Sequence, residues 1–153
     1  MNKQEFKAHS RSNLKIIIDT REQLPYLFDN FSAQTVVKGL KTGDYSIDGE
    51  EENVACERKS LPDLIGCVTK NRKRFEKELM RLSMMILKAV VVEGSMGQIA
   101  GKEYRGRVKP SGVLGSIAFW QVKYNVPFLF CSTRELAEIT VYNLLKNYNR
   151  KNR

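Results

Sequence analysis

Residues 53–63, with the sequence NVACERKSLPD, decide the fold of this chain. The stretch begins with short apolar residues that are typical of a strand. It continues through the charged residues Glu57, Arg58 and Lys59 into Ser60, which is followed by a proline and, three positions on, by an acid. A capping serine, a proline in the first turn and an acid at the third position together predict the start of a helix. A strand that leads directly into a helix predicts an α/β domain.

Three apolar segments precede this stretch. Residues 14–18 are rich in isoleucine and end at Asp19, as expected of a strand whose end delivers a polar side chain. Residues 35–40 and 45–47 are partly β-branched and are bounded by turn-forming glycines. Together with residues 53–56 they are expected to form consecutive strands of a meander. The sheet is therefore expected to be at least partly antiparallel.

The C-terminal half alternates helices and strands in the same way. Apolar residues recur at helical spacing from Phe75 to Ile86, after a basic interruption at residues 70–74 that is either a kink or a loop. Residues 97–109 are rich in glycine and cations and are expected to be a loop. The other expected elements are a strand at 89–92, a helix at 110–124, a strand at 126–131 and a helix at 134–148.

The composition is that of one globular domain. The chain has 153 residues, of which 42% are hydrophobic and 28% charged, and this excludes a wholly disordered or collagen-like protein. We expect a polar leader at residues 1–13, a single domain at 14–149 and a basic tail at 150–153. Lys and Arg number 26 against 17 Asp and Glu, a net charge of +9, which indicates a polyanionic partner such as nucleic acid or an anionic membrane surface.

Other classes of protein are disfavoured. No apolar run approaches the roughly 20 residues of a membrane-spanning helix, and the N-terminus lacks the apolar core of a signal peptide, so we expect a soluble, cytoplasmic protein with no membrane partner. The three cysteines are widely spaced among apolar residues, as is typical of reduced core cysteines. With His9 as the single histidine, a zinc site is not expected.

Carboxylates and a lysine stand at the predicted strand ends. On a strand, Glu57 and Lys59 project from one face and Arg58 from the other. Asp44 follows Gly43, a residue that permits a sharp turn. Asp44 and Glu57 could hold a magnesium-like ion, while Lys59 would stabilise charge on a phosphate or orient and help deprotonate a water molecule. By themselves, however, these residues also fit a solvated strand end and a hairpin turn.

The whole pattern resembles a known family. Residues 16–22 (IIIDTRE), 43–45 (GDY) and 57–66 (ERKSLPDLIG) resemble the GD…ERKxxxD signature of the nuclease domain of the XPF family of structure-specific DNA endonucleases. The resemblance spans about residues 14–94, and the later elements are compatible in order. It implies a restriction-endonuclease-like fold of the PD-(D/E)xK type, in which helices flank a central mixed β-sheet. It also implies cutting of DNA that depends on Mg²⁺ or Mn²⁺, with no small-molecule organic cofactor.

The resemblance assigns roles to individual residues. Asp44 and Glu57 become metal ligands and Lys59 the catalytic lysine. The other residues assigned to the catalytic site are Asp19 and Glu22, as supporting acids at the cleft, together with Arg58 and Asp63. We expect Arg58 to pair with an acid on the other side of the sheet. Asp63 is also explained as a helix-start residue, and Glu93 is a further candidate acid after its strand.

Five basic residues are candidates for binding DNA. Relatives often have an arginine before an aromatic residue, which here points to Arg72 and Arg74 before Phe75. Arg105, Arg107 and Lys109 lie in a glycine-bounded loop before a helix, and flexible cations near a helix start suit phosphate binding. The alternatives are a solvated helix start and an exposed basic loop.

The chain also differs from the family. Many relatives have a helix-hairpin-helix module or a helicase, neither of which we expect in this protein, and the sequence resembles compact bacterial or phage-encoded nucleases. We expect an endonuclease acting on branched or distorted DNA (flap, fork or junction) in repair, recombination or replication. The alternative is a catalytically silent DNA-binding or scaffold domain of the same fold. From the apolar content of residues 113–130 and the dimeric habit of the family, we expect a homodimer formed through helices and the last strand in the second half of the chain.

Overall fold

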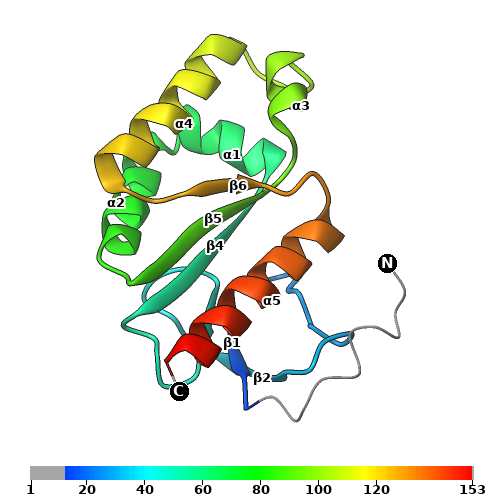
Figure 1. Cartoon of the computed structure of the whole chain (residues 1–153). Coiled ribbons are helices and arrows are strands. Elements are labelled where there is room, and N and C mark those ends of the chain that lie inside the picture. The colour runs from blue at the N-terminus through cyan, green and yellow to red at the C-terminus, as the bar shows by residue number, and fades with distance from the viewer. Residues whose placement is uncertain (1–12, 153) are drawn as a thin grey trace.

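A computed structural model describes residues 13–152, so most of the polar leader, including His9, and Arg153 lie outside the described residues. The described part forms a mixed sheet flanked by helices, as expected (Figure 1). Its strands are β1 (Lys15–Asp19), β2 (Gln34–Lys38), β3 (Tyr45–Ile47), β4 (Val54–Ser60), β5 (Leu87–Glu93) and β6 (Phe128–Phe130). Its helices are α1 (Leu61–Val68), α2 (Arg72–Ser83), α3 (Met96–Ala100), α4 (Pro110–Tyr124) and α5 (Arg134–Lys151).

The strand order is β2-β1-β3-β4-β5-β6, which corrects the expected meander. β3 pairs antiparallel with both β1 and β4, but β2 pairs in parallel with the outer side of β1. The burial pattern explains the difference. Residues 16–18 of β1 are buried and need neighbours on both sides, whereas β2 is exposed along nearly its whole length and suits the edge of the sheet.

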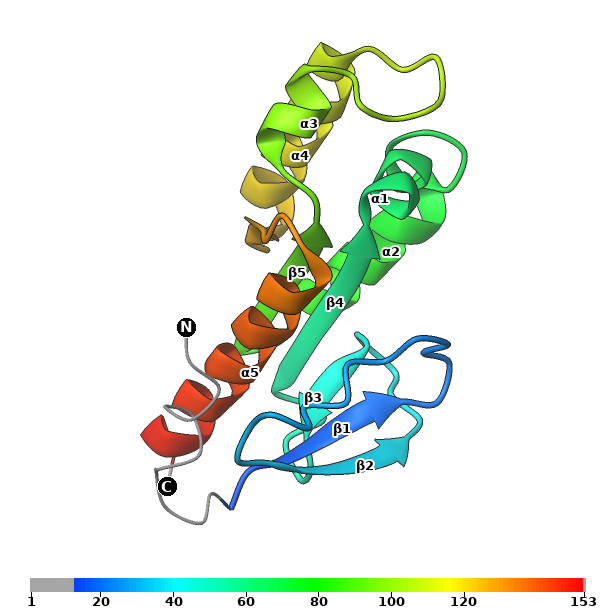
Figure 2. The same cartoon turned by 90° about the vertical axis from the view of Figure 1, so that its right-hand side faces the viewer.

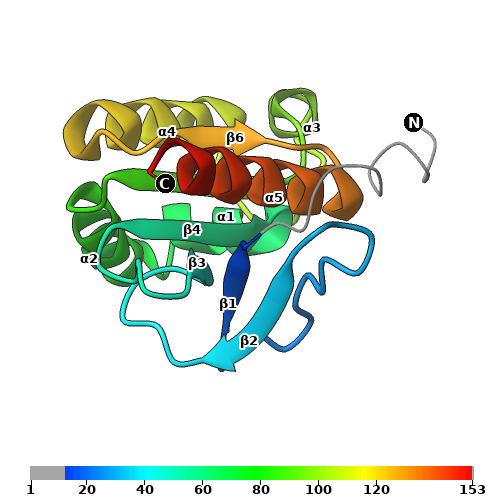
Figure 3. The same ribbon diagram turned by 60° about the horizontal axis from the view of Figure 1, so that its bottom comes forward.

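Each face of the sheet is covered by a different set of helices. Figure 2 shows α5 on one side of β4 and α1 and α2 on the other, and Figure 3 shows α5 and α2 on opposite sides of β4. Alternation along the strands divides the core accordingly, because successive side chains point to opposite faces. Ala55 and Val90 pack with α1, α2 and α4, while Val54, Cys56 and Val91 pack with α5.

The helices follow the predicted signals, with two corrections. Ser60 caps α1 by accepting a hydrogen bond from the Asp63 backbone N–H. Of the basic interruption, Lys70 and Asn71 lie in the short turn between α1 and α2, whereas residues 72–74 form the first turn of α2. Ile86 lies beyond α2 and is largely exposed. The expected loop at 97–109 begins with α3, which a reciprocal capping box between Ser95 and Gln98 starts. This serine and glutamine, three residues apart, were a readable signal in the sequence.

The cysteines lie in the core, as expected. Cys56, Cys67 and Cys131 are free and buried. Burial raises the pKa of Cys56 to about 12 and that of Cys67 to about 11, so both thiols stay protonated near neutral pH. Within residues 13–152, no helix is long and apolar enough to cross a lipid bilayer.

Candidate active site

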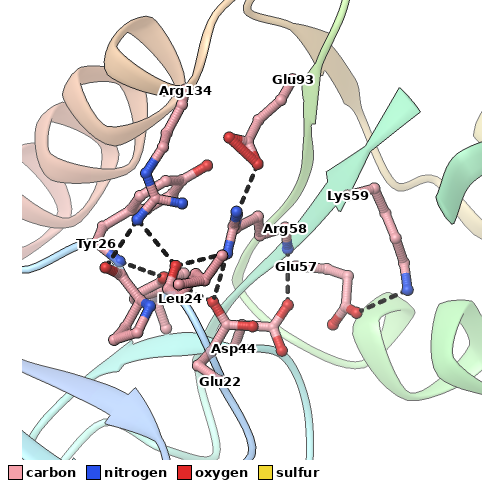
Figure 4. Close-up of polar contacts among 11 residues, drawn as sticks. Glu22, Leu24, Tyr26, Asp44, Glu57, Arg58, Lys59, Glu93 and Arg134 are labelled. Atoms are coloured by element: carbon pink, nitrogen blue, oxygen red, sulfur yellow. Dashed lines mark hydrogen bonds and ion pairs between the residues drawn. The ribbon is translucent and has the colours of Figure 1, made fainter. Parts of the chain in front are cut away.

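Strand β4 separates its three charged residues by side-chain alternation. Glu57 and Lys59 project toward α2, where Lys59 Nζ lies 3.4 Å from Glu57 Oε1, 3.9 Å from Glu78 Oε2 and 5.2 Å from the centre of the Phe75 ring. Arg58 projects toward the opposite face (Figure 4). The expected separation of Arg58 from the Glu57–Lys59 pair is therefore confirmed.

The turn before β3 brings Asp44 to the same place. Gly43 has a φ of +77°, and the Asp44 backbone N–H donates to the Cys56 carbonyl at 2.9 Å. The Asp44 carbonyl accepts from the Asp19 backbone N–H at 2.9 Å, and Asp44 Oδ2 accepts from the Arg58 backbone N–H at 2.8 Å. Asp44 is thus held between β1 and β4. It directly precedes β3, which is the neighbour of the strand that carries Glu57.

These side chains line one polar cavity of about 630 Å³. It collects residues from the ends of β1, β3 and β4 and from one face of α2, and we call it the active-site cavity. Its charged lining residues are Asp19, Arg21, Lys41, Asp44, Glu57, Lys59, Asp63, Arg74, Glu78 and Arg81. Five of the seven residues assigned to the catalytic site, Asp19, Asp44, Glu57, Lys59 and Asp63, are among them.

Burial sets the protonation of the two central carboxyl groups. Desolvation raises the pKa of Asp44 to about 6, although the Arg58 backbone N–H opposes the shift. Glu57 is only 7% exposed, and burial, reinforced by the charge of Asp44, raises its pKa well above the ordinary value. Burial alone would lower the pKa of Lys59, but the Glu57 carboxylate and other neighbouring groups outweigh this, so its pKa lies above the ordinary value. Lys59 is therefore a cation near neutral pH.

The donor set of Asp44 and Glu57 fits a hard divalent cation. Both are carboxylates, the ligands that Mg²⁺ and Mn²⁺ prefer, and Mg²⁺ is commonly held by one or two carboxylates while it keeps several waters. Their pKa values are raised because the neighbouring groups do not offset the cost of burying two negative charges. Between residues 13 and 152 no three His, Cys, Asp or Glu side chains group closely enough to hold a metal ion by themselves. Any bound ion would therefore need water or substrate oxygens to complete its coordination.

Arg58 organises a second polar cluster on the other face of the sheet (Figure 4). Its guanidinium donates to Glu93 Oε1 at 2.7 Å and lies 5.0 Å from the centre of the Tyr26 ring. It also pairs with Glu22 Oε2 at 3.4 Å, which in turn accepts from the Tyr45 hydroxyl at 2.7 Å. Glu22 and Arg58 line a separate cavity of about 410 Å³ rather than the active-site cavity. We expected Arg58 to pair with an acid on this face of the sheet, and it pairs with two, Glu93 and Glu22.

The other predicted residues have distinct environments. Asp19 is buried and accepts hydrogen bonds from Arg21 Nε at 2.7 Å and from the Leu40 backbone N–H at 2.8 Å, so it anchors the chain beside the cavity. Asp63 is exposed in the first turn of α1. Among the five predicted DNA-binding residues, Arg74 lines the active-site cavity. Arg105 and Arg107 lie in the α3–α4 segment, and Lys109 is the N-cap of α4.

Known proteins share both the sequence pattern and this architecture. A family model described as the ERCC4 domain matches residues 18–144. The chain belongs to the ERCC4 domain family. The match confirms the resemblance to the XPF nuclease domain that the motifs carry.

Two solved structures are similar to this ERCC4 domain. XPF from Aeropyrum pernix has a TM-score of 0.72 at 20% identity, with 89% of this chain and 65% of that chain covered. XPF from Aeropyrum pernix in complex with DNA has a TM-score of 0.69 at 21% identity, with 92% and 66% covered. The chain thus spans just under two thirds of each XPF chain, and the likeness confirms the restriction-endonuclease-like fold. Comparison with curated proteins gives no match.

In this ERCC4 domain, two residues that line the cavity were not predicted from the sequence. Glu78 and Arg81 of α2 line the active-site cavity together with Arg74. The three residues are spaced i, i+4 and i+7 and therefore share one helix face, which adjoins the buried face of Phe75 and Leu79. That polar face was readable from the sequence, but the side of the sheet on which α2 packs was not.

Replacing Gly43 with alanine should damage both the fold and the site of this ERCC4 domain. A Cβ there would lie 2.9 Å from Ala55 Cβ and 3.1 Å from the Cys56 carbonyl oxygen, on a backbone with φ of +77°. We expect a loss of stability on the order of 1–3 kcal/mol, together with displacement of Asp44. Gly49→Ala is the matched control, because φ there is +87° but no atom of the described residues lies within 4 Å of the added Cβ. Equal thermal unfolding of the two variants would contradict the close approach at Gly43.

Proposed function

We propose that this protein is a divalent-metal-dependent endonuclease that hydrolyses phosphodiester bonds in DNA, on branched or distorted substrates. The observation that carries the proposal is the grouping of Asp44, Glu57 and Lys59 in one polar cavity whose walls include Arg74 and Arg81. Metal-assisted phosphodiester hydrolysis requires carboxylates that hold a cation, together with a lysine and arginines that contact phosphates. Membership of the ERCC4 domain family and the likeness to XPF, which has been solved in complex with DNA, support it.

Each residue has a role that follows from its environment. Asp44 and Glu57 would hold Mg²⁺ or Mn²⁺, which when bound acidifies water and offsets negative charge on the phosphate. Lys59 is charged because Glu57 and other neighbouring groups together outweigh the effect of burial on its pKa. A charged ammonium favours stabilisation of the phosphate in the transition state over removal of a proton from water. The Arg58 backbone N–H fixes the orientation of Asp44.

Cleavage assays test the proposal directly. Purified protein is incubated with labelled flap, fork, four-way junction and linear duplex DNA, with Mg²⁺, Mn²⁺ or a chelator. We expect metal-dependent incision, faster on the branched substrates than on linear duplex. Binding without incision of any substrate would instead support the alternative of a catalytically silent DNA-binding or scaffold domain. Equal affinity for RNA or anionic vesicles would contradict a dedicated DNA enzyme.

Arg74 and Arg72 should respond differently to truncation. Arg74 is exposed at the active-site cavity, so Arg74→Ala should weaken DNA binding and reduce the slope of log affinity against log salt by about one unit. Arg72 donates to Glu76 Oε1 at 2.9 Å and to Ser116 Oγ at 2.8 Å, and it lies 5.0 Å from the Trp120 ring centre. Arg72→Ala should therefore lower stability by on the order of 1 kcal/mol. A salt series and thermal unfolding of both variants distinguish these effects, and a larger loss of DNA affinity for Arg72→Ala would reverse the assignment.

We also propose that the protein forms a homodimer through α4. The apolar content of residues 113–130 is largely used inside the domain, since Val113, Ile117 and Trp120 are buried. The opposite side of α4 presents Phe119, 50% exposed, and Val122, 86% exposed. Val122→Glu should shift a dimer to the monomer mass in light scattering at several concentrations. A monomer mass for the unmodified protein at every concentration would refute the proposal.

A further inference from the structure

A second groove of about 680 Å³ lies beside the active-site cavity, between α1 and the α3–α4 segment. Figure 2 shows this segment arching out at the same end of the molecule as the turn that follows α1. The floor of the groove is apolar and is formed by Pro62, Ile65, Tyr104 and Val108. We call it the α1 groove.

The segment that closes the α1 groove is held by its own contacts. The Tyr104 hydroxyl donates to the Val108 carbonyl at 2.7 Å, and Lys102 Nζ donates to the Gly106 carbonyl at 2.9 Å. Lys102 Nζ also lies 5.3 Å from the centre of the Tyr104 ring. The aromatic ring is therefore fixed at the floor of the groove.

The rim of the α1 groove is cationic. Lys70, Arg105 and Arg107 line it, against Glu103 as the acidic member of the lining. All three cations are exposed, and within the described part of the chain they make no hydrogen bond or ion pair. Their donors are therefore available to an anionic ligand, in contrast to Arg72, which is used internally.

The α1 groove adjoins the active-site cavity across the first turn of α1. Asp63 lines the active-site cavity, and the preceding Pro62 lines the groove. The eight residues of α1 span about 12 Å at 1.5 Å per residue. This length corresponds to roughly three to four stacked nucleotides at 3.4 Å per phosphate. A DNA strand leaving Glu57 and Lys59 and running along α1 would meet the groove within a few nucleotides.

We propose that the α1 groove is a subsite for unpaired nucleotides of the DNA strand flanking the cut, a proposal that rests on the proposed nuclease function. Phosphates meet Lys70, Arg105 and Arg107, and an unstacked base packs on the apolar floor against Tyr104. A paired duplex presents phosphates and base edges, while its base faces are stacked and unavailable to an apolar surface. Cations around an apolar, aromatic floor therefore match single-stranded DNA better than duplex.

Photocrosslinking tests where the unpaired strand lies. 5-Iododeoxyuridine is placed at successive positions of a single-stranded arm next to a duplex, and the same positions are tested after a complementary strand is annealed. The unmodified protein is used without divalent metal, so that the DNA stays intact. We expect a crosslink to Tyr104 from the unpaired arm, roughly tenfold stronger than from the paired arm. Equal crosslinking from paired and unpaired arms, or no crosslink to Tyr104, would overturn the proposal.

Charge reversal provides a second measurement on the same DNA. Lys70→Glu with Arg107→Glu should weaken binding of armed DNA about tenfold more than binding of blunt duplex. The matched control, Arg150→Glu with Lys151→Glu, makes the same charge change at the exposed end of α5 and should affect both DNAs alike. Equal losses on armed and blunt DNA for the Lys70 and Arg107 variant would refute the subsite.

Parallel cleavage assays separate the two proposals. Incision of branched DNA without a Tyr104 crosslink overturns the subsite and leaves the nuclease function standing. A crosslink that requires an unpaired arm, without incision at any metal concentration, supports the subsite and overturns the nuclease function. Absence of binding to every DNA overturns both.

Discussion

Glu57→Gln and Asp44→Asn should each reduce metal-dependent DNA cleavage by at least about 100-fold. Both changes keep the shape of the side chain but remove the anionic oxygen that a divalent cation needs. DNA affinity should stay the same or increase, because each variant removes a negative charge that repels phosphate. Single-turnover cleavage across a range of Mg²⁺ and Mn²⁺ concentrations, together with binding in a chelator, measures the two effects separately.

The thermal stability of the variants shows whether cleavage is lost because the chemistry fails or because the protein unfolds. Because burial raises the pKa of Glu57, a neutral glutamine suits the same position, and Glu57→Gln should unfold in metal-free buffer at the same temperature as the unmodified protein or higher. Glu51→Gln serves as the control, since Glu51 pairs with Lys38 on the surface and should leave cleavage unchanged. Cleavage at the original rate by Glu57→Gln or Asp44→Asn would show that the metal ligands are assigned wrongly.

Lys59→Met should remove most turnover, by roughly 100- to 1,000-fold, while metal binding is largely retained. The methionine keeps the apolar stem against Phe75 but deletes the charge beside Glu57. Loss of a cation that acts mainly in the transition state should lower kcat with a smaller change in KM. Steady-state kinetics and Mn²⁺ titration measure the two properties independently.

Lys77→Met is the matched control for this experiment. Lys77 is exposed on α2, next to Glu78 in sequence but outside the lining of the active-site cavity. Its removal should change kcat less than threefold, since exposed charges contribute little. Equal kcat values for the Lys59 and Lys77 variants would contradict the role assigned to Lys59.

Local signals predicted most of the elements. The capping serine before α1, the apolar spacing of α2 and the isoleucines of β1 appear in the structure close to the expected positions. The separation of Glu57 and Lys59 from Arg58 also followed from sequence, because alternation is a local property of a strand. The prediction of strand pairing was wrong, because the edge position of β2 depends on which strands β1 needs as neighbours, and this is a long-range choice.

The sequence by itself determined the α/β class, the strand-to-helix passage at Ser60 and the identity of the acids and lysine at the strand ends. Only the tertiary structure decided which of these groups meet. In the tertiary structure Asp44 lies between β1 and β4, and Glu78 and Arg81 of α2 line the same cavity. Glu22 instead pairs with Arg58 on the other face of the sheet. The physical reason is that hydrophobic periodicity specifies which face of an element is buried, whereas the packing of α2 and α5 on opposite sides of the sheet specifies which polar faces converge.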